Sequence, residues 1–373
     1  MKKKKIAFLS TQFKEVQSGP GRFTEYLRTL PFEQIEIHFF SQQIGRKEPL
    51  LHPVSIPGWA KRIPFSSFFR AWYFKKALEK TDVTENFDWI LAADYSMAMF
   101  LNRNSLKKTA VMVNDDNFLL SHSERSAKGR LSWRTWLSRK LGYFMERHVV
   151  RKSAFSIANS KYTLKLMEDV YKPDTKPLLL YKAVDTSWFQ YEEHPNRPPR
   201  NYLFVKNDWK RGGLDLILKA LAKLPNGTER HFQIAGIGSG SLQEVENTIR
   251  ESGFQGKCTI QGLINRDQLK ELLRTSDLFL NFSHQEALGV SCLEAMASGL
   301  PVLASDAGGL KEVLDQGRAG LMVPAGDLEA LTQMLHILEE EPQILQEKAR
   351  LGREQARLFS VENLKSNMET LFG

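Results

Sequence analysis

Residues 283–309 of the chain read SHQEALGVSCLEAMASGLPVLASDAGG. Two carboxylates, Glu286 and Glu294, stand eight residues apart around a turn that contains Gly289, and a helix is expected to follow that turn. The first turn of a helix presents unpaired backbone N–H groups and the positive end of the helix dipole, which favour an anion such as a diphosphate. A carboxylate on each side of that anion would accept hydrogen bonds from sugar hydroxyls. The stretch therefore predicts a nucleotide-sugar site.

This stretch resembles the signature of the family 4 retaining glycosyltransferases, an E-x7-E pattern followed by E-A-x-A-x-G-x-P-V. The positions that match are Glu286, Glu294, Ala295, Ala297, Gly299, Pro301 and Val302. The alternative interpretation is a surface helix with two solvated acids, which is the usual environment of glutamate. We favour the nucleotide-sugar site, because the spacing of the acids, the small residues and the Gly-x-Pro all coincide with the family's pattern.

The composition indicates a soluble globular protein of two domains. A chain of 373 residues is long for one hydrophobic core, and 42% of its residues are hydrophobic and 25% charged. Cys258 and Cys292 stand in apolar patterns without metal-ligand spacing, which predicts reduced core thiols in a cytosolic protein. The apolar run after the first lysines is too short for a signal peptide or a membrane span, so we interpret residues 6–9 as a buried strand.

Short apolar runs alternate with helix-length segments along the chain. They lie at residues 6–9, 35–40, 89–92, 110–113 and 155–158, and again at 203–205, 232–235, 278–281, 301–304 and 320–323. This βαβ pattern predicts an α/β fold with two Rossmann-like domains, each a parallel sheet covered by helices. The polar, proline-rich stretch 192–201 separates the two series and is predicted to be a linker.

The family resemblance implies the GT-B fold, in which two Rossmann-like domains face each other across a cleft. It implies an acceptor-binding N-terminal domain at residues 1–182 and a nucleotide-sugar-binding domain at residues 183–357. It also implies a C-terminal helix, at about residues 358–373, that returns to the first domain. The resemblance is strong from about residue 202 to residue 324 and weak before residue 144.

A second motif, VKNDWKRGGLD at residues 205–215, follows a predicted strand and opens a predicted helix. It resembles the family's V-G-x-D-x-x-R-K-G, but Lys206 stands where glycine is usual, and Gly212 stands where the phosphate-binding lysine is usual. We therefore predict that Lys210 or Arg211 supplies the cation for the diphosphate, since an arginine fork bonds two phosphate oxygens. The alternative is a pair of solvated cations at a helix start, where the helix dipole disfavours them.

Glycine-rich turns of the C-terminal half are further candidates for donor contacts. The sequence GIGSG begins at Gly236, and taken alone it hints at a dinucleotide fingerprint. Its third glycine comes too early for that fingerprint, and the family has a G-x-G turn at this point. The resemblance places the base-contacting segment at Gly262, Leu263 and Ile264.

The N-terminal half offers fewer candidates. Gly19 and Gly21 follow the first strand, and they form either a loop close to the donor phosphates or a plain βα turn. The strand at 110–113 is followed by Asp115 and Asp116, where many family members carry a His-Asp pair. One of these aspartates takes that polar role or caps the turn. We predict no metal site, because enzymes of this fold generally need none.

The net charge of +9 favours an anionic partner. Residues 58–80 and 125–152 carry the surplus and mix Trp, Phe and Tyr with Lys and Arg, a composition suited to a bilayer interface with anionic head groups. The alternative is that the aromatic rings pack inside and the cations form a solvated face. Nucleic acid is a poorer fit, because no helix-turn-helix, zinc or RNP pattern is present in the sequence.

The resemblance implies a retaining hexosyltransferase that uses a nucleotide diphosphate sugar, with a UDP-sugar as the expected donor, and needs no cofactor. The expected acceptor is a glycan or a lipid-linked acceptor of cell-envelope synthesis, reached at the cytoplasmic face of the membrane. A narrower similarity is to the lipopolysaccharide-core glucosyltransferases. Two alternatives stay open: a GT-B nucleotide-sugar epimerase or hydrolase, with its base at Asp115 or Asp116, and a non-catalytic sugar-nucleotide binding subunit.

The resemblance also implies a role for each candidate residue. Lys210 and Arg211 would hold the phosphates, Glu286 the sugar hydroxyls and Glu294 the ribose. Asp115 is the remaining catalytic candidate. The turn between the two glutamates supplies further donor-binding candidates, which are Ala287, Leu288, Gly289 and Val290.

Overall fold

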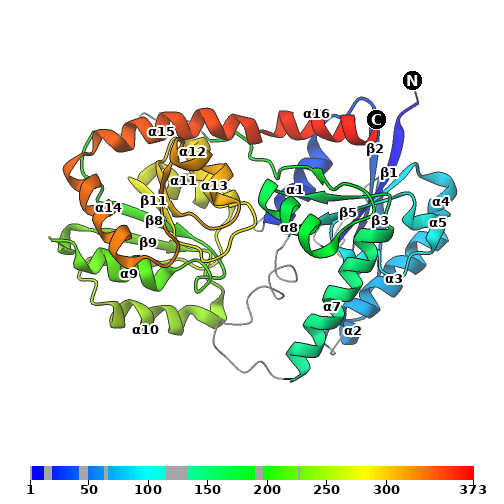
Figure 1. Cartoon of the computed structure of the whole chain (residues 1–373), viewed down its shortest axis with the longest axis horizontal. Helices are drawn as coiled ribbons and strands as arrows, with labels where there is room; N and C mark the ends of the chain where they lie inside the picture. Colours follow the sequence, from blue (N-terminus) through cyan, green and yellow to red (C-terminus); the bar gives the residue numbers. More distant parts are fainter. Residues whose placement is uncertain are drawn as a thin grey trace. The chain divides into compact units, whose positions relative to one another are not determined.

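The computed structural model describes residues 2–11, 19–41, 49–62, 66–114, 133–189, 196–225 and 227–373. The chain divides into two units, the first made of residues 1–181 with 364–373 and the second of residues 182–363 (Figure 1). Each unit holds one parallel sheet. None of the helices in the described part of the chain is long and apolar enough to cross a bilayer.

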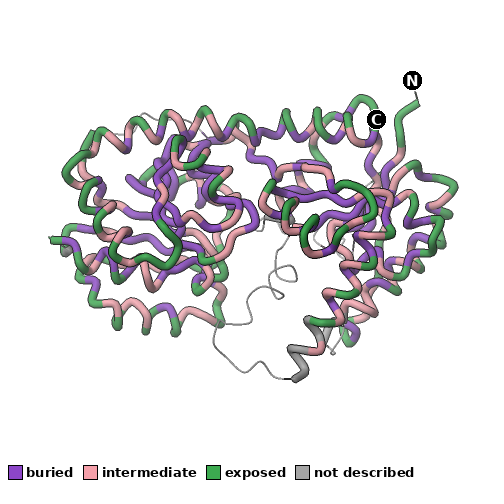
Figure 2. The backbone as a smooth tube through the Cα atoms, in the orientation of Figure 1, coloured by how far each residue is buried: buried purple, intermediate pink, exposed green. Residues whose placement is uncertain are grey.

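The sheet of the first unit has seven strands in the order β3-β2-β1-β4-β5-β6-β7. All neighbouring strands pair in parallel. The strands are β1 (Lys4–Ser10), β2 (Ile35–Ser41), β3 (Leu51–Pro53), β4 (Trp89–Ala92), β5 (Thr109–Val113), β6 (Phe155–Ala158) and β7 (Leu178–Leu179). The central strands are buried along most of their length, which explains why they read as continuous apolar runs in the sequence (Figure 2).

Helices connect and cover these strands. They are α1 (Gly19–Thr29), α2 (Gly58–Arg62), α3 (Ser66–Lys80), α4 (Val83–Asn86), α5 (Arg103–Leu106), α7 (Trp133–Lys152), α8 (Lys161–Tyr171) and the last helix of the chain, α16 (Val361–Phe372). The end of α16 completes the first unit: the Phe372 ring lies 6.0 Å from the Trp89 ring and 5.8 Å from the Phe155 ring, centroid to centroid. The Glu369 carboxylate accepts a hydrogen bond of 3.2 Å from the backbone N–H of Gln34.

The sheet of the second unit has six parallel strands in the order β10-β9-β8-β11-β12-β13. The strands are β8 (Asn201–Val205), β9 (His231–Ala235), β10 (Lys257–Ile260), β11 (Leu278–Asn281), β12 (Val302–Ser305) and β13 (Leu321–Val323). The helices are α9 (Leu214–Lys223), α10 (Leu242–Ser252), α11 (Arg266–Thr275), α12 (Val290–Ser298), α13 (Leu310–Val313), α14 (Leu328–Glu340) and α15 (Gln343–Ala356).

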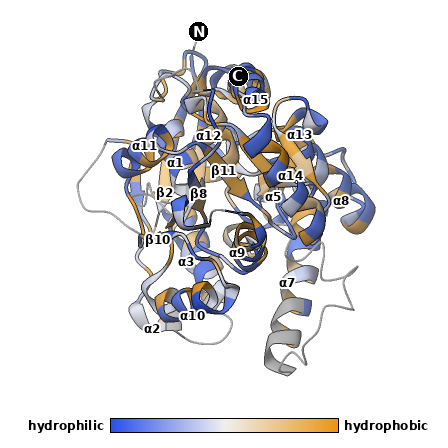
Figure 3. Ribbon diagram, turned by 90° about the vertical axis from the view of Figure 1, so that its left-hand side faces the viewer, coloured by the Kyte–Doolittle hydropathy of each residue, from blue (hydrophilic) through white to orange (hydrophobic). Residues whose placement is uncertain are grey.

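The core of the second unit lies between its sheet and the apolar faces of its helices. Helix α9 buries Leu214, Ile217, Leu218 and Leu221 at helical spacing against Phe204 and Leu280 of the sheet, among other core residues. Figure 3 shows the hydrophobic colouring along β11 and α9. Helix α14 packs beside α9 and buries Leu331, Leu335 and Leu338.

The predicted α/β fold with two Rossmann-like sheets is confirmed, and each predicted apolar run coincides with a strand, except that Pro301 and Gly320 stand just before β12 and β13. Three short strands, β3, β7 and β10, carry no long apolar run and are not among the predicted runs. The chain passes from one unit to the other at residues 181 and 182, before the proline-rich stretch. The described end of that stretch is fastened to the second unit, because the Asp277 carboxylate accepts hydrogen bonds of 2.9 Å from Arg200 N–H and 2.8 Å from Asn201 N–H.

Each sheet has a point where the direction of strand addition reverses. It lies between β1 and β4 in the first unit and between β8 and β11 in the second. The loops that leave two such neighbouring strands go to opposite faces of the sheet, so a crevice opens at the carboxyl ends of the strands, and ligands of open α/β sheets bind there. The motif at 283–309 follows β11 and therefore lies at the reversal point of the second unit.

Candidate functional site at the strand reversal of the second unit

Two loops meet at the carboxyl ends of β8 and β11, which are paired neighbours in the sheet. The backbone N–H of Phe282 donates a 3.1 Å hydrogen bond to the carbonyl oxygen of Gly212. The N–H of His284 donates a 3.1 Å bond to the carbonyl oxygen of Arg211. The two motifs singled out in the sequence, 205–215 and 283–309, are thus held side by side by main-chain hydrogen bonds.

Glycines make this close approach possible. Gly213 has a φ of 70°, and a Cβ at this position would lie 2.2 Å from the carbonyl oxygen of Phe282. A Cβ at Gly309 would lie 2.3 Å from the carbonyl oxygen of Ala287, and the N–H of Gly309 donates a 2.9 Å bond to the carbonyl of Glu286. The glycine pair after β12 therefore supports the turn that carries Glu286.

The Lys206 side chain reaches into the same turn. This contact was not predicted from the sequence. Its ammonium donates a 2.5 Å hydrogen bond to the Glu286 carboxylate and a 2.7 Å bond to Ser283 Oγ. The side chains of this ion pair are only 17% and 19% exposed. The position of Lys206, directly after a buried strand and opposite the E-x7-E turn, was the available signal, but the residue was noted only as a departure from the family's glycine.

Glu294 lies in α12, the helix that follows this turn, and is 4% exposed. The neighbouring Cys292 is fully buried, and Asn281 Nδ2 lies 3.3 Å from its sulfur. Burial raises the pKa of the Cys292 thiol to about 12. Cys292 is a free, buried thiol, as predicted, and its burial disfavours the thiolate. Helix α12 has Gly289 as its N-cap, with a φ of 100° and no side-chain cap hydrogen bond.

The two predicted cations of the β8–α9 loop lie in different places. Arg211 stays with the Glu286 turn, since its Nε donates a 3.0 Å hydrogen bond to the carbonyl oxygen of Gln285. The Lys210 ammonium forms an exposed ion pair with Glu244 on α10 and lies 5.2 Å from the centroid of the Trp209 ring. The structure therefore brings Arg211, and not Lys210, to the side of Glu286.

The remaining candidates of the second unit line the same edge of the sheet. The N–H of Gly236, whose φ is 84°, donates a 2.9 Å bond to the carbonyl of Gly262. Leu263 is 58% exposed and Ile264 is half-buried, as expected of a segment open to a ligand. Of the other turn residues, Ala287, Leu288 and Gly289 are buried and Val290 is half-buried.

The first unit holds the other predicted residues. Gly19 begins α1, and Gly21 lies in its first turn, so both residues belong to the start of the helix and not to a loop before it. Asp115 and Asp116 lie outside the described residues. In the described part of the chain, no group of three or more His, Cys, Asp or Glu side chains is arranged to hold a metal ion.

Two asparagines at the carboxyl ends of β5 and β6 were missed. Asn114 Nδ2 donates a 2.8 Å bond to the Ala93 carbonyl, and Asn159 Nδ2 donates a 3.1 Å bond to the Asn114 carbonyl. Within the described residues, the side-chain oxygens of both are buried without a hydrogen-bond partner. Buried acceptors of this kind are rare and suit a hydroxyl donor. The sequence indicated these two asparagines only by their position, since each is a polar residue directly after a buried strand.

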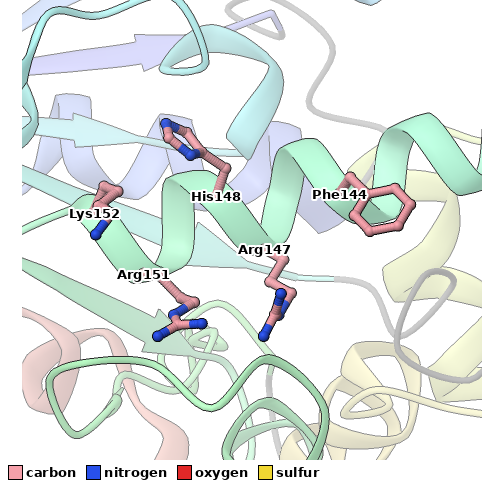
Figure 4. A pocket seen from close by; sticks show the side chains of 5 residues that line it. All are labelled: Phe144, Arg147, His148, Arg151 and Lys152. Carbon is pink, nitrogen blue, oxygen red and sulfur yellow. The ribbon is translucent and has the colours of Figure 1, made fainter.

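The basic segment 125–152 ends in α7, where a group of side chains lines a pocket of about 350 Å³ (Figure 4). These are Phe144, Arg147, His148, Arg151 and Lys152. Figure 4 shows Arg147 and Arg151 extending to the same side of the helix, as their spacing of one turn requires. Asp174 pairs with Arg151 at 2.9 Å and with Lys152 at 3.7 Å. Phe144 is 59% exposed.

The aromatic residues of segment 58–80 are divided between core and surface. Phe74 is fully buried, whereas Trp59 is 56% and Trp72 is 42% exposed. Neither the interpretation as a bilayer interface nor the interpretation as rings packed inside the protein therefore holds for the whole of segment 58–80. The side chains of Trp133 and Trp136 in segment 125–152 lie outside those described.

Comparison with known proteins shows what parts of this chain are similar to. Residues 188–357 match the family described as "Glycosyl transferases group 1". An uncharacterized glycosyltransferase of Methanocaldococcus jannaschii is 32% identical over 123 residues, which are 32% of this chain and 31% of that protein. The lipopolysaccharide glucosyltransferase WaaG of Escherichia coli is 28% identical over 121 residues, which are 32% of each chain. The matched part spans only 24% to 40% of the length of the first curated relatives.

Similarity of structure extends over the whole chain. The crystal structure of HepE from Anabaena in complex with UDP and glucose matches with a TM-score of 0.75 and 16% sequence identity, and it covers 99% of both chains. At this identity the likeness shows the fold alone. Residues 188–357 of this protein therefore match the glycosyl transferases group 1 family, and the whole chain has the GT-B fold.

Proposed function

We propose that this protein is a family 4 retaining glycosyltransferase that moves a hexose from a UDP-sugar to a hydroxyl of a glycan or lipid-linked acceptor in cell-envelope synthesis. The observation that carries the proposal is the convergence of Arg211, Lys206 and Glu286 with the uncapped N-terminus of α12 at the strand reversal of the second unit. Cations and a helix N-terminus bind a diphosphate, and a carboxylate beside them accepts hydrogen bonds from the hydroxyls of a sugar. The site therefore suits a diphosphate joined to a sugar.

In this proposal the protein acts by orientation and by stabilising the leaving diphosphate. The diphosphate would lie at the N-terminus of α12, beside the guanidinium of Arg211. Glu286 would accept hydrogen bonds from the hexose, and Glu294 from the ribose. Gly236 and the exposed segment at Leu263 would lie along the nucleoside. Lys210 would have to leave Glu244 to take part. Transfer with retention would then proceed on the front face of the sugar, without a protein nucleophile.

The nucleotide is tested by ligand-dependent thermal stabilisation. A ligand that binds only the folded state raises the melting temperature, and at a hundredfold excess over its Kd it adds about 2.7 kcal/mol to the free energy of unfolding. We expect UDP to raise the melting temperature more than GDP, ADP or CDP, since the fold is shared with a protein solved in complex with UDP. No shift with any of the four would contradict the proposed function.

The Glu294→Ala variant is expected to bind UDP about 10- to 100-fold more weakly than the parent, because a charge-assisted hydrogen bond to the ribose is lost. The measurement is isothermal titration with UDP. Glu329→Ala on α14 is the matched control, since Glu329 is exposed and pairs only with Lys223 among the described residues. Equal UDP affinity of Glu294→Ala and the parent would remove Glu294 from the site.

We also propose that the enzyme meets its acceptor at an anionic membrane surface of the cytoplasmic face. The exposed Phe144 beside Arg147, Arg151 and Lys152 supports this, because an apolar ring with surrounding cations suits the head-group region. Lys107 and Arg103 extend the positive surface, as they line an adjoining pocket of about 630 Å³.

A double variant, Arg147→Gln with Lys152→Gln, is expected to bind phosphatidylglycerol vesicles about 10- to 30-fold more weakly, at about 1 kcal/mol for each cation near the surface. The measurement is vesicle co-sedimentation at low salt, with phosphatidylcholine vesicles for comparison. Lys219→Gln with Lys223→Gln on α9 removes the same charge from the other unit and should leave binding unchanged. If both double variants lose binding equally, only net charge matters and the α7 surface has no special role.

A second candidate function is the non-catalytic sugar-nucleotide binding subunit. It is favoured by one observation: Gly212 carries no cation, and the Lys206 side chain lies where the family has only a glycine. Release of UDP from the bound UDP-sugar separates the candidates. A transferase releases UDP faster when acceptor is added, a hydrolase or epimerase turns over donor without acceptor, and a binding subunit does neither.

A further inference from the structure

We propose that Lys206 binds the diphosphate of the donor, and that it replaces the cation which the family's motif would place at position 212. This inference rests on the proposed function and names the residue that the site uses. The sequence showed two separate departures from the motif, a lysine in place of a glycine and a glycine in place of a lysine. In the structure the two departures lie side by side.

The packing around Gly212 couples the two positions. A Cβ at position 212 would lie 2.9 Å from Lys206 Cδ and 2.6 Å from Cζ of Phe204. Real Cβ atoms essentially never show contacts this short, so a side chain at position 212 would require the Phe204 ring and the Lys206 side chain to move. The methylene groups of Lys206 occupy the space beside Gly212, and the ammonium continues to the Glu286 turn.

The ammonium of Lys206 retains a free bonding direction. An ammonium has three N–H donors. Among the described residues, two acceptors contact it, Glu286 and Ser283. Its side chain is 17% exposed, so the third donor is available to a ligand at the turn. Ser283 is itself held in place, since its hydroxyl bonds Asn281 Oδ1 at 2.5 Å and its carbonyl accepts a 2.5 Å bond from Ser305 Oγ.

A diphosphate bound beside the Glu286 carboxylate needs a cation between the two negative charges. A carboxylate and a diphosphate that share one site repel each other, and the repulsion weakens binding of the anion. Lys206 neutralises Glu286 and presents a positive charge to the phosphates at the same time. Arg211 supplies a second cation from the same loop, held by Gln285. Lys210 is directed to Glu244 and is not needed for this arrangement.

The opposing hypothesis is that Lys206 fills the donor site. In that case the lysine occupies the volume that a glycine would leave to the phosphates, and its removal would improve nucleotide binding. The effect of the charge of Lys206 must therefore be measured separately from the effect of its side-chain volume. Lys206→Met keeps most of the volume without the charge, Lys206→Ala removes both, and Lys206→Arg keeps the charge.

The experiment is isothermal titration of the whole chain with UDP at two salt concentrations. We expect Lys206→Met and Lys206→Ala to bind UDP about 10- to 100-fold more weakly, because a charge-assisted bond to phosphate is lost. We expect Lys206→Arg to stay within about 5-fold of the parent and the methionine variant to show a weaker salt dependence. Lys219→Met on α9, whose lysine is exposed and pairs with Asp215, should bind as the parent does.

The outcomes are distinct. If the parent binds no nucleoside diphosphate, the proposed function itself fails. If the parent binds UDP, and Lys206→Met or Lys206→Ala binds it equally or more tightly, Lys206 is not the diphosphate cation and the proposal is overturned. Loss of binding in Lys210→Met, with none in Lys206→Met, would overturn it in favour of Lys210. The melting temperature without ligand confirms folding, and Lys206→Gln serves if the methionine variant does not fold.

Discussion

The Glu286→Ala variant is expected to bind UDP at least as tightly as the parent but to release UDP from the UDP-sugar about 100-fold or more slowly. Glu286 is proposed to contact the hexose and not the nucleotide, so its loss leaves the sugar poorly oriented for transfer. The same change frees the Lys206 ammonium from its 2.5 Å ion pair and makes it available to the phosphates. Transfer and nucleotide binding should therefore change in opposite directions.

The measurements are initial rates of UDP release and titration with UDP alone. Glu286→Gln should fall between Ala and the parent, because the amide retains one acceptor oxygen. His284→Ala is the matched control, since His284 is an exposed residue of the same turn and its backbone bond to Arg211 is independent of the side chain. Full turnover by Glu286→Ala would show that the hexose is held elsewhere.

The Glu339→Ala variant is expected to lower the free energy of unfolding of the second unit by about 3–5 kcal/mol. Its partner, Arg230, has a fully buried side chain at the start of β9, and Arg230 Nε donates a 2.8 Å bond to Glu339. The Tyr202 hydroxyl lies 3.5 Å from the same carboxylate, and burial together with Glu339 raises the pKa of that phenol. Removal of Glu339 leaves a buried guanidinium without a counter-charge.

Urea unfolding, with hydrogen exchange of β9 and α14 to localise the effect, measures this loss. Glu340→Ala is the matched control one residue further along α14. Glu340 forms an exposed pair of 3.5 Å with His336, and such a pair contributes at most about 0.5 kcal/mol. A loss in Glu339→Ala no larger than in Glu340→Ala would show that solvent reaches Arg230 readily.

Several features followed from local sequence alone. The strands with long apolar runs were predictable, because a parallel strand covered on both faces must be apolar along its length. The short strands β3, β7 and β10 were not, since two to four residues that are mostly half-exposed produce no such run. The Glu286 turn was predictable, because its glycines, carboxylates and helix start are contiguous in the chain. The linker position was misjudged, because residues 196–200 are polar by sequence but are fastened by the distant Asp277.

Local sequence was enough to predict the two-sheet α/β architecture and the helix that starts between Glu286 and Glu294, because each depends on periodicity or on neighbours in the chain. The packing of distant elements decided which cation meets Glu286, since Lys206 and Glu286 are 80 residues apart. It also decided that Lys210 turns to Glu244, that Asn114 and Asn159 leave buried acceptors open, and that Arg230 pairs with Glu339. The direction of a long side chain depends on the packing of distant elements, and local sequence carries no record of that packing.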